Sequence, residues 1–160
     1  MTYSDAFQAA RRADLNQFRQ ALIGVNLDAT TTNERNLLHI AIAYRRPENS
    51  IELINRGINV NWQDEEGSTP LHYATNYGQL EVVRLILKKG GDYSVVDKHG
   101  NTPLWYAVFN ARGHYDIVAL LLQSGAVPTL KNNNNRSPLD FAQQIGDEKL
   151  ISILKIHEKH

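Results

Sequence analysis

A repeat of about 33 residues runs through most of this chain and constrains its fold more than any other feature. Residues 64–72 recur as residues 97–105, so that Thr69 and Thr102 stand 33 positions apart. Ser137 follows Thr102 by 35 positions, which indicates a local insertion. A period of this length is typical of solenoids, in which each unit buries its apolar face only against its neighbours.

Each repeat predicts two short helices joined by a tight turn. A Ser or Thr that can cap a helix, followed by a proline suited to the first helical position, stands at Thr69, Thr102 and Ser137. Glycines that can end this helix in the left-handed conformation follow at Gly78, Gly113 and Gly146. A second apolar pattern at helical spacing comes next, at Leu80, Val83, Ile86 and Leu87 and again at Tyr115, Val118, Leu121 and Leu122.

The insertion can be located from the distance between the first helix and its closing glycine. Leu71 and Gly78 are 7 positions apart, whereas Leu104 and Gly113 are 9 apart. The two extra residues therefore fall within residues 109–112, and we expect this turn to project outward.

These repeats resemble the ankyrin repeat family. The resemblance rests on D-x-x-G-x-T-P-L-H at residues 64–72, D-x-x-G-x-T-P-L at 97–104, G-x-x-E-V-V at 78–83 and L-I-L-K-K-G at 85–90. It implies an all-α ankyrin-repeat solenoid of about five helix pairs with β-turn finger loops. We expect a single domain over 1–160, with an N-terminal capping repeat at 5–30, full repeats at 31–63, 64–96 and 97–131, and a C-terminal capping repeat at 132–160.

The outer repeats depart from the pattern. Asn36 and Leu37 replace the Thr-Pro pair of the first full repeat, and Arg45 begins the segment that replaces its glycine. In the last repeat Asn135 takes the place of the loop glycine, and we expect it to adopt the left-handed conformation, which Asn tolerates. Atypical ends are expected because the outer faces of terminal repeats meet water.

Charge and composition narrow the class of protein. The chain has 17 basic and 17 acidic residues, and this balance argues against a nucleic-acid binder, which needs a net basic footprint. It has no cysteine, which excludes disulfides, thiol nucleophiles and cysteine-type zinc sites. No secretory signal precedes the repeats, and no run approaches the roughly 20 apolar residues of a membrane helix. We expect a soluble cytoplasmic protein without a membrane partner.

No arrangement of residues predicts catalysis, a cofactor or a metal. His39 and His72 occupy the motif position at which, as the resemblance implies, the ring bridges neighbouring backbone groups. His157 and His160 form H-x-x-H in the tail, but no further ligand accompanies them, so a solvated tail is the favoured interpretation. Glu65 and its neighbour sit at a loop tip, which offers no pocket for acid–base chemistry. We therefore expect a protein that is not an enzyme.

The resemblance implies that the inner helices and loop tips line a concave surface that binds proteins. Aromatic and Arg side chains there suit a protein interface, because such residues dominate binding energy. The candidate partner-binding residues are Trp62, Glu65, Glu66, Ser68, Asn76, Tyr77, Lys98, His99, Asn101, Trp105, Phe109, Asn110, Arg112 and Arg136. We expect Trp62, Tyr77, Phe109 and Arg112 to be the most exposed, while Tyr73 and Tyr106 belong mainly to the core. Trp105 has an alternative role as a filler between repeats.

A finer resemblance concerns residues 100–113 and 136–140, which are similar to small bacterial ankyrin proteins encoded beside polymorphic toxins. Such relatives act as immunity proteins, or antitoxins, that bind a toxin and block its active site or substrate entrance. The resemblance implies a toxin domain as the partner. A general adaptor or regulatory scaffold subunit is the alternative. We expect a monomer when free, although Trp62 and the apolar C-terminal helix offer a route to self-association.

Overall fold

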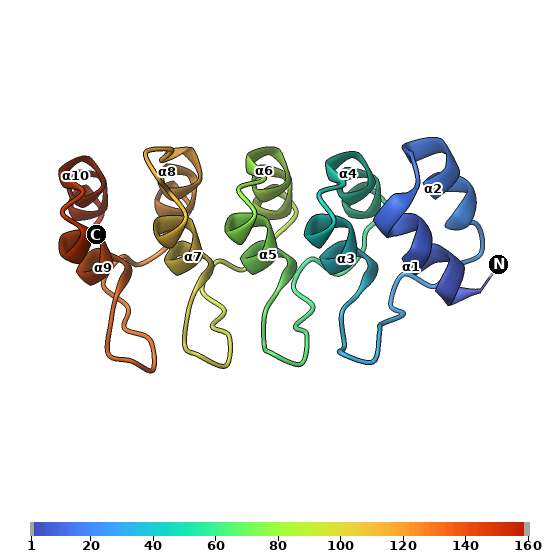
Figure 1. Cartoon of the computed structure of the whole chain (residues 1–160), viewed down its shortest axis with the longest axis horizontal. Helices are drawn as coiled ribbons and strands as arrows, with labels where there is room; N and C mark the ends of the chain where they lie inside the picture. The colour runs from blue at the N-terminus through green and yellow to red at the C-terminus, as the bar shows by residue number, and fades with distance from the viewer. Residues whose placement is uncertain (1, 159–160) are drawn as a thin grey trace.

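In the part of the chain that the structure describes, ten helices stack as five antiparallel pairs in a single row, with a finger-like loop between successive pairs (Figure 1). The computed structural model describes residues 2–158. Its helices are α1 Tyr3–Arg12, α2 Leu15–Ala21, α3 Leu37–Ala43, α4 Pro47–Asn55, α5 Pro70–Asn76, α6 Leu80–Lys88, α7 Pro103–Phe109, α8 Asp116–Gln123, α9 Pro138–Ile145 and α10 Glu148–Ile156. This arrangement confirms the predicted all-α solenoid. The described residues contain no strand, only an isolated antiparallel bridge between Thr30 and Asn36.

The predicted caps start the odd-numbered helices. The Thr69 side chain accepts a bond from the His72 backbone N–H, and the His72 ring accepts one from the Thr69 N–H in return. Asn36 caps α3 in the same reciprocal way, and Ser137 caps α9. Thr102 has no side-chain capping bond, and the third helical position after it holds Trp105, whose indole accepts no hydrogen bond.

One apolar core runs the length of the row. Odd-numbered helices of successive pairs pack on one another, α1 on α3, α3 on α5, α5 on α7 and α7 on α9. Among the even-numbered helices, α2 packs on α4, α4 on α6 and α6 on α8. Its largest fully buried side chains include Phe18, Leu37, Leu38, Leu53, Leu71, Ile86, Leu104, Leu121, Leu150 and Leu154. Burial of large apolar side chains at each junction supplies the main stabilisation of such a stack.

The C-terminal helix α10 packs against α9 of the same terminal repeat. Leu150 and Leu154 are fully buried, and Ile151 and Ile153 contact the core, while Ile156 stays exposed. Within residues 2–158, none of the helices combines the length and apolar character that crossing a lipid bilayer requires.

Among the described residues, four other than glycine adopt positive φ. Glu34 (58°) and Arg45 (54°) occupy places that hold glycine in the central repeats, and Asn135 (58°) takes the predicted left-handed conformation. Arg112 (45°) lies in the inserted turn, directly before Gly113. A side chain costs about 1–2 kcal/mol in this conformation, so Glu34 and Arg45 carry strain that glycine avoids at the same places in the central repeats.

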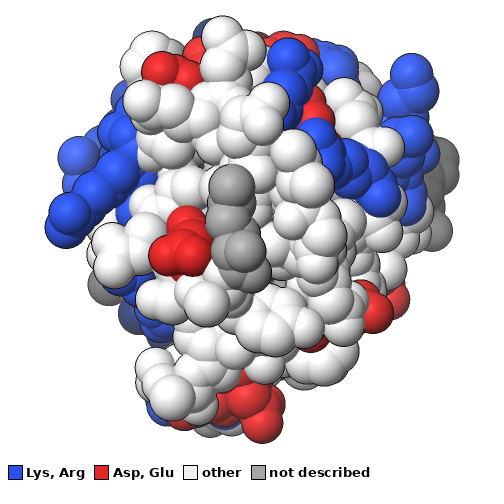
Figure 2. Space-filling view, turned by 90° about the vertical axis from the view of Figure 1, so that its right-hand side faces the viewer, with Lys and Arg blue, Asp and Glu red and all other residues white. Residues whose placement is uncertain are grey.

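The N-terminal end of the row faces the viewer in Figure 2. Basic side chains gather along its left and upper right margins, and acidic ones lie at the top, the centre and the lower edge. Charges of both signs therefore alternate on the part of this face that the structure describes.

Candidate functional site

The finger loops are built around a buried aspartate. Asp64 Oδ1 accepts from the backbone N–H groups of Glu66 (3.0 Å) and Ser68 (2.9 Å), which closes the loop. Asp64 Oδ2 accepts from the Tyr73 hydroxyl at 2.7 Å, and this bond ties the loop to the middle of α5. Burial and this carboxylate together raise the pKa of Tyr73. Tyr73 is half-buried and packs against the core.

The next loop repeats this arrangement and the last one modifies it. Asp97 Oδ2 accepts from the Tyr106 hydroxyl at 2.6 Å, and burial and this bond raise the pKa of Tyr106 to about 12. In the last repeat the aspartate becomes Asn132 and the tyrosine becomes Phe141. Phenylalanine has no hydroxyl to donate, and asparagine has no second carboxylate oxygen to accept. The donor and the acceptor of this hydrogen bond are therefore both absent from the last repeat.

Two buried histidines join each loop to the next. His39 Nε2 lies 2.9 Å from the Ser68 carbonyl, and His72 Nε2 lies 3.0 Å from the Asn101 carbonyl. Each Nδ1 accepts a backbone N–H, which places the ring proton on Nε2. Burial lowers the pKa of His39 to about 4 and also lowers that of His72. Both rings are structural, as the motif predicts.

The charged loop tips contact each other instead of standing free. Lys98 forms an ion pair with Glu66, and the Asn33 side-chain amide donates to Glu65. Backbone bonds run beside these contacts, from Lys98 N–H to the Glu66 carbonyl at 2.9 Å and from Asn133 N–H to the His99 carbonyl at 3.0 Å. A partner that binds these tips would have to share or displace contacts between fingers.

Trp62 and Tyr77 are less exposed than predicted. The Trp62 indole N–H donates to the Glu34 carbonyl of the preceding finger at 2.6 Å, so this ring joins two loops. Tyr77 lies beneath the guanidinium of Arg45, which stands 5.5 Å from the ring centre. Both side chains are half-buried because a neighbouring repeat covers them, a contact that reading one repeat at a time does not reveal.

The faces of the odd-numbered helices and the loops before them form what we call the inner surface. A pocket of about 230 Å³ opens on it between Arg35 and Ser68 of the loops, residues of α3, α5 and α7 that include Tyr73 and Tyr106, and Tyr77 at the end of α5. Beside this pocket the Asn110 side-chain amide donates to the side-chain oxygen Oδ1 of Asn76 at 3.0 Å. The bond holds two predicted contact residues together across adjacent repeats.

Three other predicted residues meet at Phe141 of α9. The ring centres of Phe109 and Trp105 lie 5.2 and 5.8 Å from that of Phe141, and the Arg136 guanidinium lies 5.9 Å from it. We call these four residues the Phe141 cluster. Phe109 is 54% exposed, and Ile145, one helical turn beyond Phe141, is 53% exposed. The cluster therefore offers apolar and cationic surface at the C-terminal half of the inner surface.

The inserted turn after α7 presents Arg112 to solvent, in agreement with the prediction. Ser68 and Asn101, by contrast, contribute their backbone carbonyls to the hydrogen bonds with the histidine rings.

No group of three or more His, Asp or Glu side chains suited to a metal ion occurs among residues 2–158. His160 lies outside the described residues, and the ring of His157 contacts the Ile153 carbonyl at 3.2 Å.

Sequence reasoning missed four residues that shape the inner surface. Arg35 lies 3.6 Å from Asp64 and 5.6 Å from the Tyr73 ring centre, and Arg11 stacks on exposed Tyr44 at 5.3 Å. Arg45 and Phe141 complete the set. Arg45 and Phe141 could have been found by aligning repeats, because one occupies a glycine position and the other the tyrosine position. Nothing in the sequence pairs Arg11 with Tyr44.

Comparisons with known proteins agree with this architecture. A family model described as "Ankyrin repeats (3 copies)" matches residues 6–97 and, in a second overlapping match, residues 52–132. A "Probable serine/threonine-protein kinase" of Dictyostelium discoideum is 34% identical over 136 residues, which cover 82% of this chain and 16% of that protein. The chain thus spans only a small part of the length of this relative. With most of its residues matched, the chain belongs to the ankyrin repeat family, whose repeats are protein-interaction modules.

Proposed function

We propose that the chain is a non-catalytic antitoxin that binds a toxin domain through its inner surface and covers that toxin's active site or substrate entrance. The observation that carries the binding role is the Phe141 cluster, where Phe109 is 54% exposed beside stacked aromatic rings and Arg136. Exposed aromatic residues with a neighbouring arginine are the side chains that contribute most to protein interfaces.

The immunity role rests on the resemblance of residues 100–113 and 136–140 to bacterial ankyrin proteins encoded beside polymorphic toxins. These segments include Phe109, Arg112 and Arg136, so the resemblance and the exposed surface coincide. We propose that it acts in the cytoplasm. A free monomer suits a one-to-one inhibitor.

Binding is tested by co-expressing the chain with the product of the adjacent gene, followed by size-exclusion chromatography and calorimetry. Replacing Phe109 and Arg112 by alanine should raise Kd by about 30-fold or more, equivalent to about 2 kcal/mol. Both side chains are exposed, so the melting temperature should change little. The matched control replaces Ile23, which is exposed in the turn after α2, and Arg84, which is exposed on α6, and it should leave Kd unchanged.

An unchanged Kd in the Phe109/Arg112 variant would remove these residues from the site. A complex that forms without loss of toxin activity would instead favour the adaptor role. An adjacent gene that encodes no toxin would also favour the adaptor role, and the proposed binding surface would then serve another partner.

A further inference from the structure

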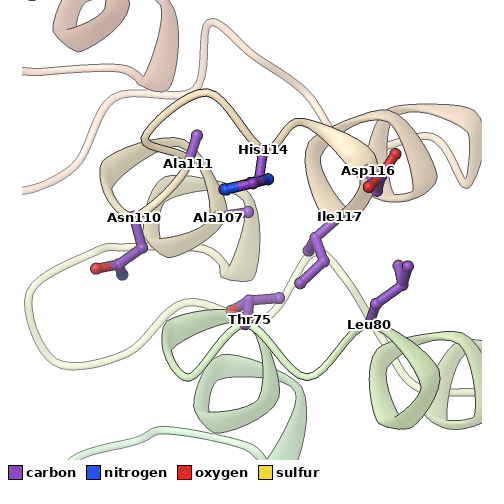
Figure 3. A pocket seen from close by; sticks show the side chains of 9 residues that line it. Thr75, Leu80, Ala107, Asn110, Ala111, His114, Asp116 and Ile117 are labelled. Carbon is purple, nitrogen blue, oxygen red and sulfur yellow. The ribbon is translucent and has the colours of Figure 1, made fainter.

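The turns that follow α5 and α7 enclose a pocket of about 320 Å³, which we call the junction slot. It is lined by Thr75, Gly78, Leu80, Ala107, Asn110, Ala111, His114, Asp116 and Ile117. In Figure 3, His114 lies on one side of the slot and Thr75 on the other, with the Ile117 side chain directed toward Thr75. The slot lies beside the inserted turn and is separate from the pocket on the inner surface.

The two preceding junctions show what normally fills this position. Arg46, the N-cap of α4, donates from Nε to the Arg11 carbonyl at 3.1 Å. Gln79, the N-cap of α6, donates from Nε2 to the Ile42 carbonyl at 2.8 Å. In both cases a side chain from one pair reaches the penultimate carbonyl of the odd-numbered helix of the pair before it. Each donor thereby bridges two adjacent turns.

The third junction lacks this donor. Alignment through Gly78 and Gly113 places His114 where Gln79 stands, and the penultimate residue of α5 is Thr75. Within residues 2–158 the His114 ring makes no hydrogen bond to α5, and the Thr75 carbonyl accepts only from backbone N–H groups. The two inserted residues lengthen the turn that carries His114, and the slot is left open.

The chemistry of the slot fits a long side chain with a cationic end. Leu80, Ala107 and Ile117 provide an apolar wall for an aliphatic stem. Thr75, whose backbone carbonyl accepts from no side chain, also lines the slot, and Asp116 adds a negative charge. Arg46 shows that a guanidinium suits such a junction, because it reaches the carbonyls of both Arg11 and Arg12.

We propose that the junction slot receives an arginine side chain of the bound partner, in the position that Arg46 and Gln79 occupy in the two preceding junctions. The inference rests on the proposed function for the source of this arginine, while the site itself is a property of the chain alone. It makes the inserted turn a second contact region beside the Phe141 cluster. The partner would then present an arginine near the apolar surface that contacts Phe109.

The slot is tested without the partner, by titrating N-acetyl-L-arginine amide into the ¹⁵N-labelled protein. Saturable amide shifts should be confined to residues that line the slot, such as Thr75, Gly78 and Ile117. N-acetyl-L-citrulline amide, which has the same shape without the charge, should bind at least ten times more weakly. Equal shifts from both compounds, shifts spread over the acidic surface or no saturable shift would overturn the proposal.

Three variants test the assignment of the slot further. His114→Gln should close the slot as Gln79 closes the preceding junction, and the shifts should disappear. Gln79→Ala should open that preceding junction and create a second set of shifts around Ile42. If the parent shows no binding but Arg112→Gln does, the chain's own Arg112 occupies the slot and the partner arginine is excluded.

The partner then separates this inference from the proposed function. A toxin that binds the parent and His114→Gln equally well would refute the use of the slot and leave the antitoxin role intact. A slot that binds the arginine probe in a chain that forms no complex would refute the antitoxin role and leave the site.

Discussion

Acid should destabilise this protein at a pH where its carboxylates are still ionised, because His39 is buried between repeats. Burial lowers the pKa of the folded-state ring from 6.5 to about 4. Between these two pKa values, His39 of the unfolded chain binds a proton and His39 of the folded chain does not. The contribution of neutral His39 is fully present above pH 6.5 and is lost as the pH falls from 6.5 toward 4.

The size of the loss follows from the two pKa values. At pH 7 both states are mostly neutral, whereas at pH 5 the unfolded ring is protonated and the folded ring is not. With 1.36 kcal/mol for each pKa unit, His39 removes about 2 kcal/mol from the free energy of unfolding between pH 7 and 5. The pKa of His72 is lowered by burial in the same way, so it adds a loss of the same sign.

Urea denaturation at pH 7, 6 and 5 measures this slope directly. Glu52, Asp92 and Asp140 also have lowered pKa values, but their ordinary values of 4.5 or below place their losses mainly below this window. His39→Gln should be less stable at pH 7 and should lose about 2 kcal/mol less than the parent on going to pH 5. His99→Gln, at an exposed loop position, is the control and should keep the parental slope.

A parental slope that survives in His39→Gln would refute the assignment. So would a His39 ring that titrates near its ordinary pKa of 6.5 in the folded protein, as followed by NMR of the ring carbons.

Three further changes test the loops, each measured by urea denaturation. Glu34→Gly should raise the free energy of unfolding by up to about 1 kcal/mol, because it removes strain at a φ of 58°, and a loss would contradict the strain argument. Tyr106→Phe should cost about 1–2 kcal/mol in the parent but little in Asp97→Asn, since Asn132 and Phe141 already form this pairing; an equal cost in both backgrounds would contradict the coupling. Lys98→Ala should cost less than about 1 kcal/mol, and the cost should fade in 0.5 M salt because its pair with Glu66 is solvent-exposed; a larger, salt-independent cost would point to another role.

The solenoid could be predicted because the signals that determine the helices of each repeat lie within that repeat. Thr69 and Pro70 mark the start of a helix, Gly78 marks its end, and these signals act within a few residues of each other. The same local logic located the inserted turn and the left-handed Asn135. Such features depend on backbone conformation, which neighbouring residues in the chain largely determine.

The candidate site was harder to predict because its contacts cross between repeats. Trp62 was expected to be exposed, yet its indole N–H bonds to a carbonyl of the preceding finger. Phe141 was overlooked, although Phe109 and Trp105 pack against its ring. The charges of Glu66 and Lys98 were expected to face a partner and instead contact each other. Side-chain partners about 30 residues away depend on how the repeats stack, which no single repeat encodes.

The contacts between fingers also have a mechanical consequence. Along the helices, successive repeats are joined by close-packed apolar side chains, which resist compression and separation. Along the fingers they are joined by polar contacts, which combine a few backbone hydrogen bonds with solvent-exposed side-chain pairs such as Glu66 with Lys98, and water can replace the exposed pairs at little cost. A stack held firmly along one edge and loosely along the other bends about the firm edge. The inner surface can thus open or tighten its curvature to match a partner while the core stays intact.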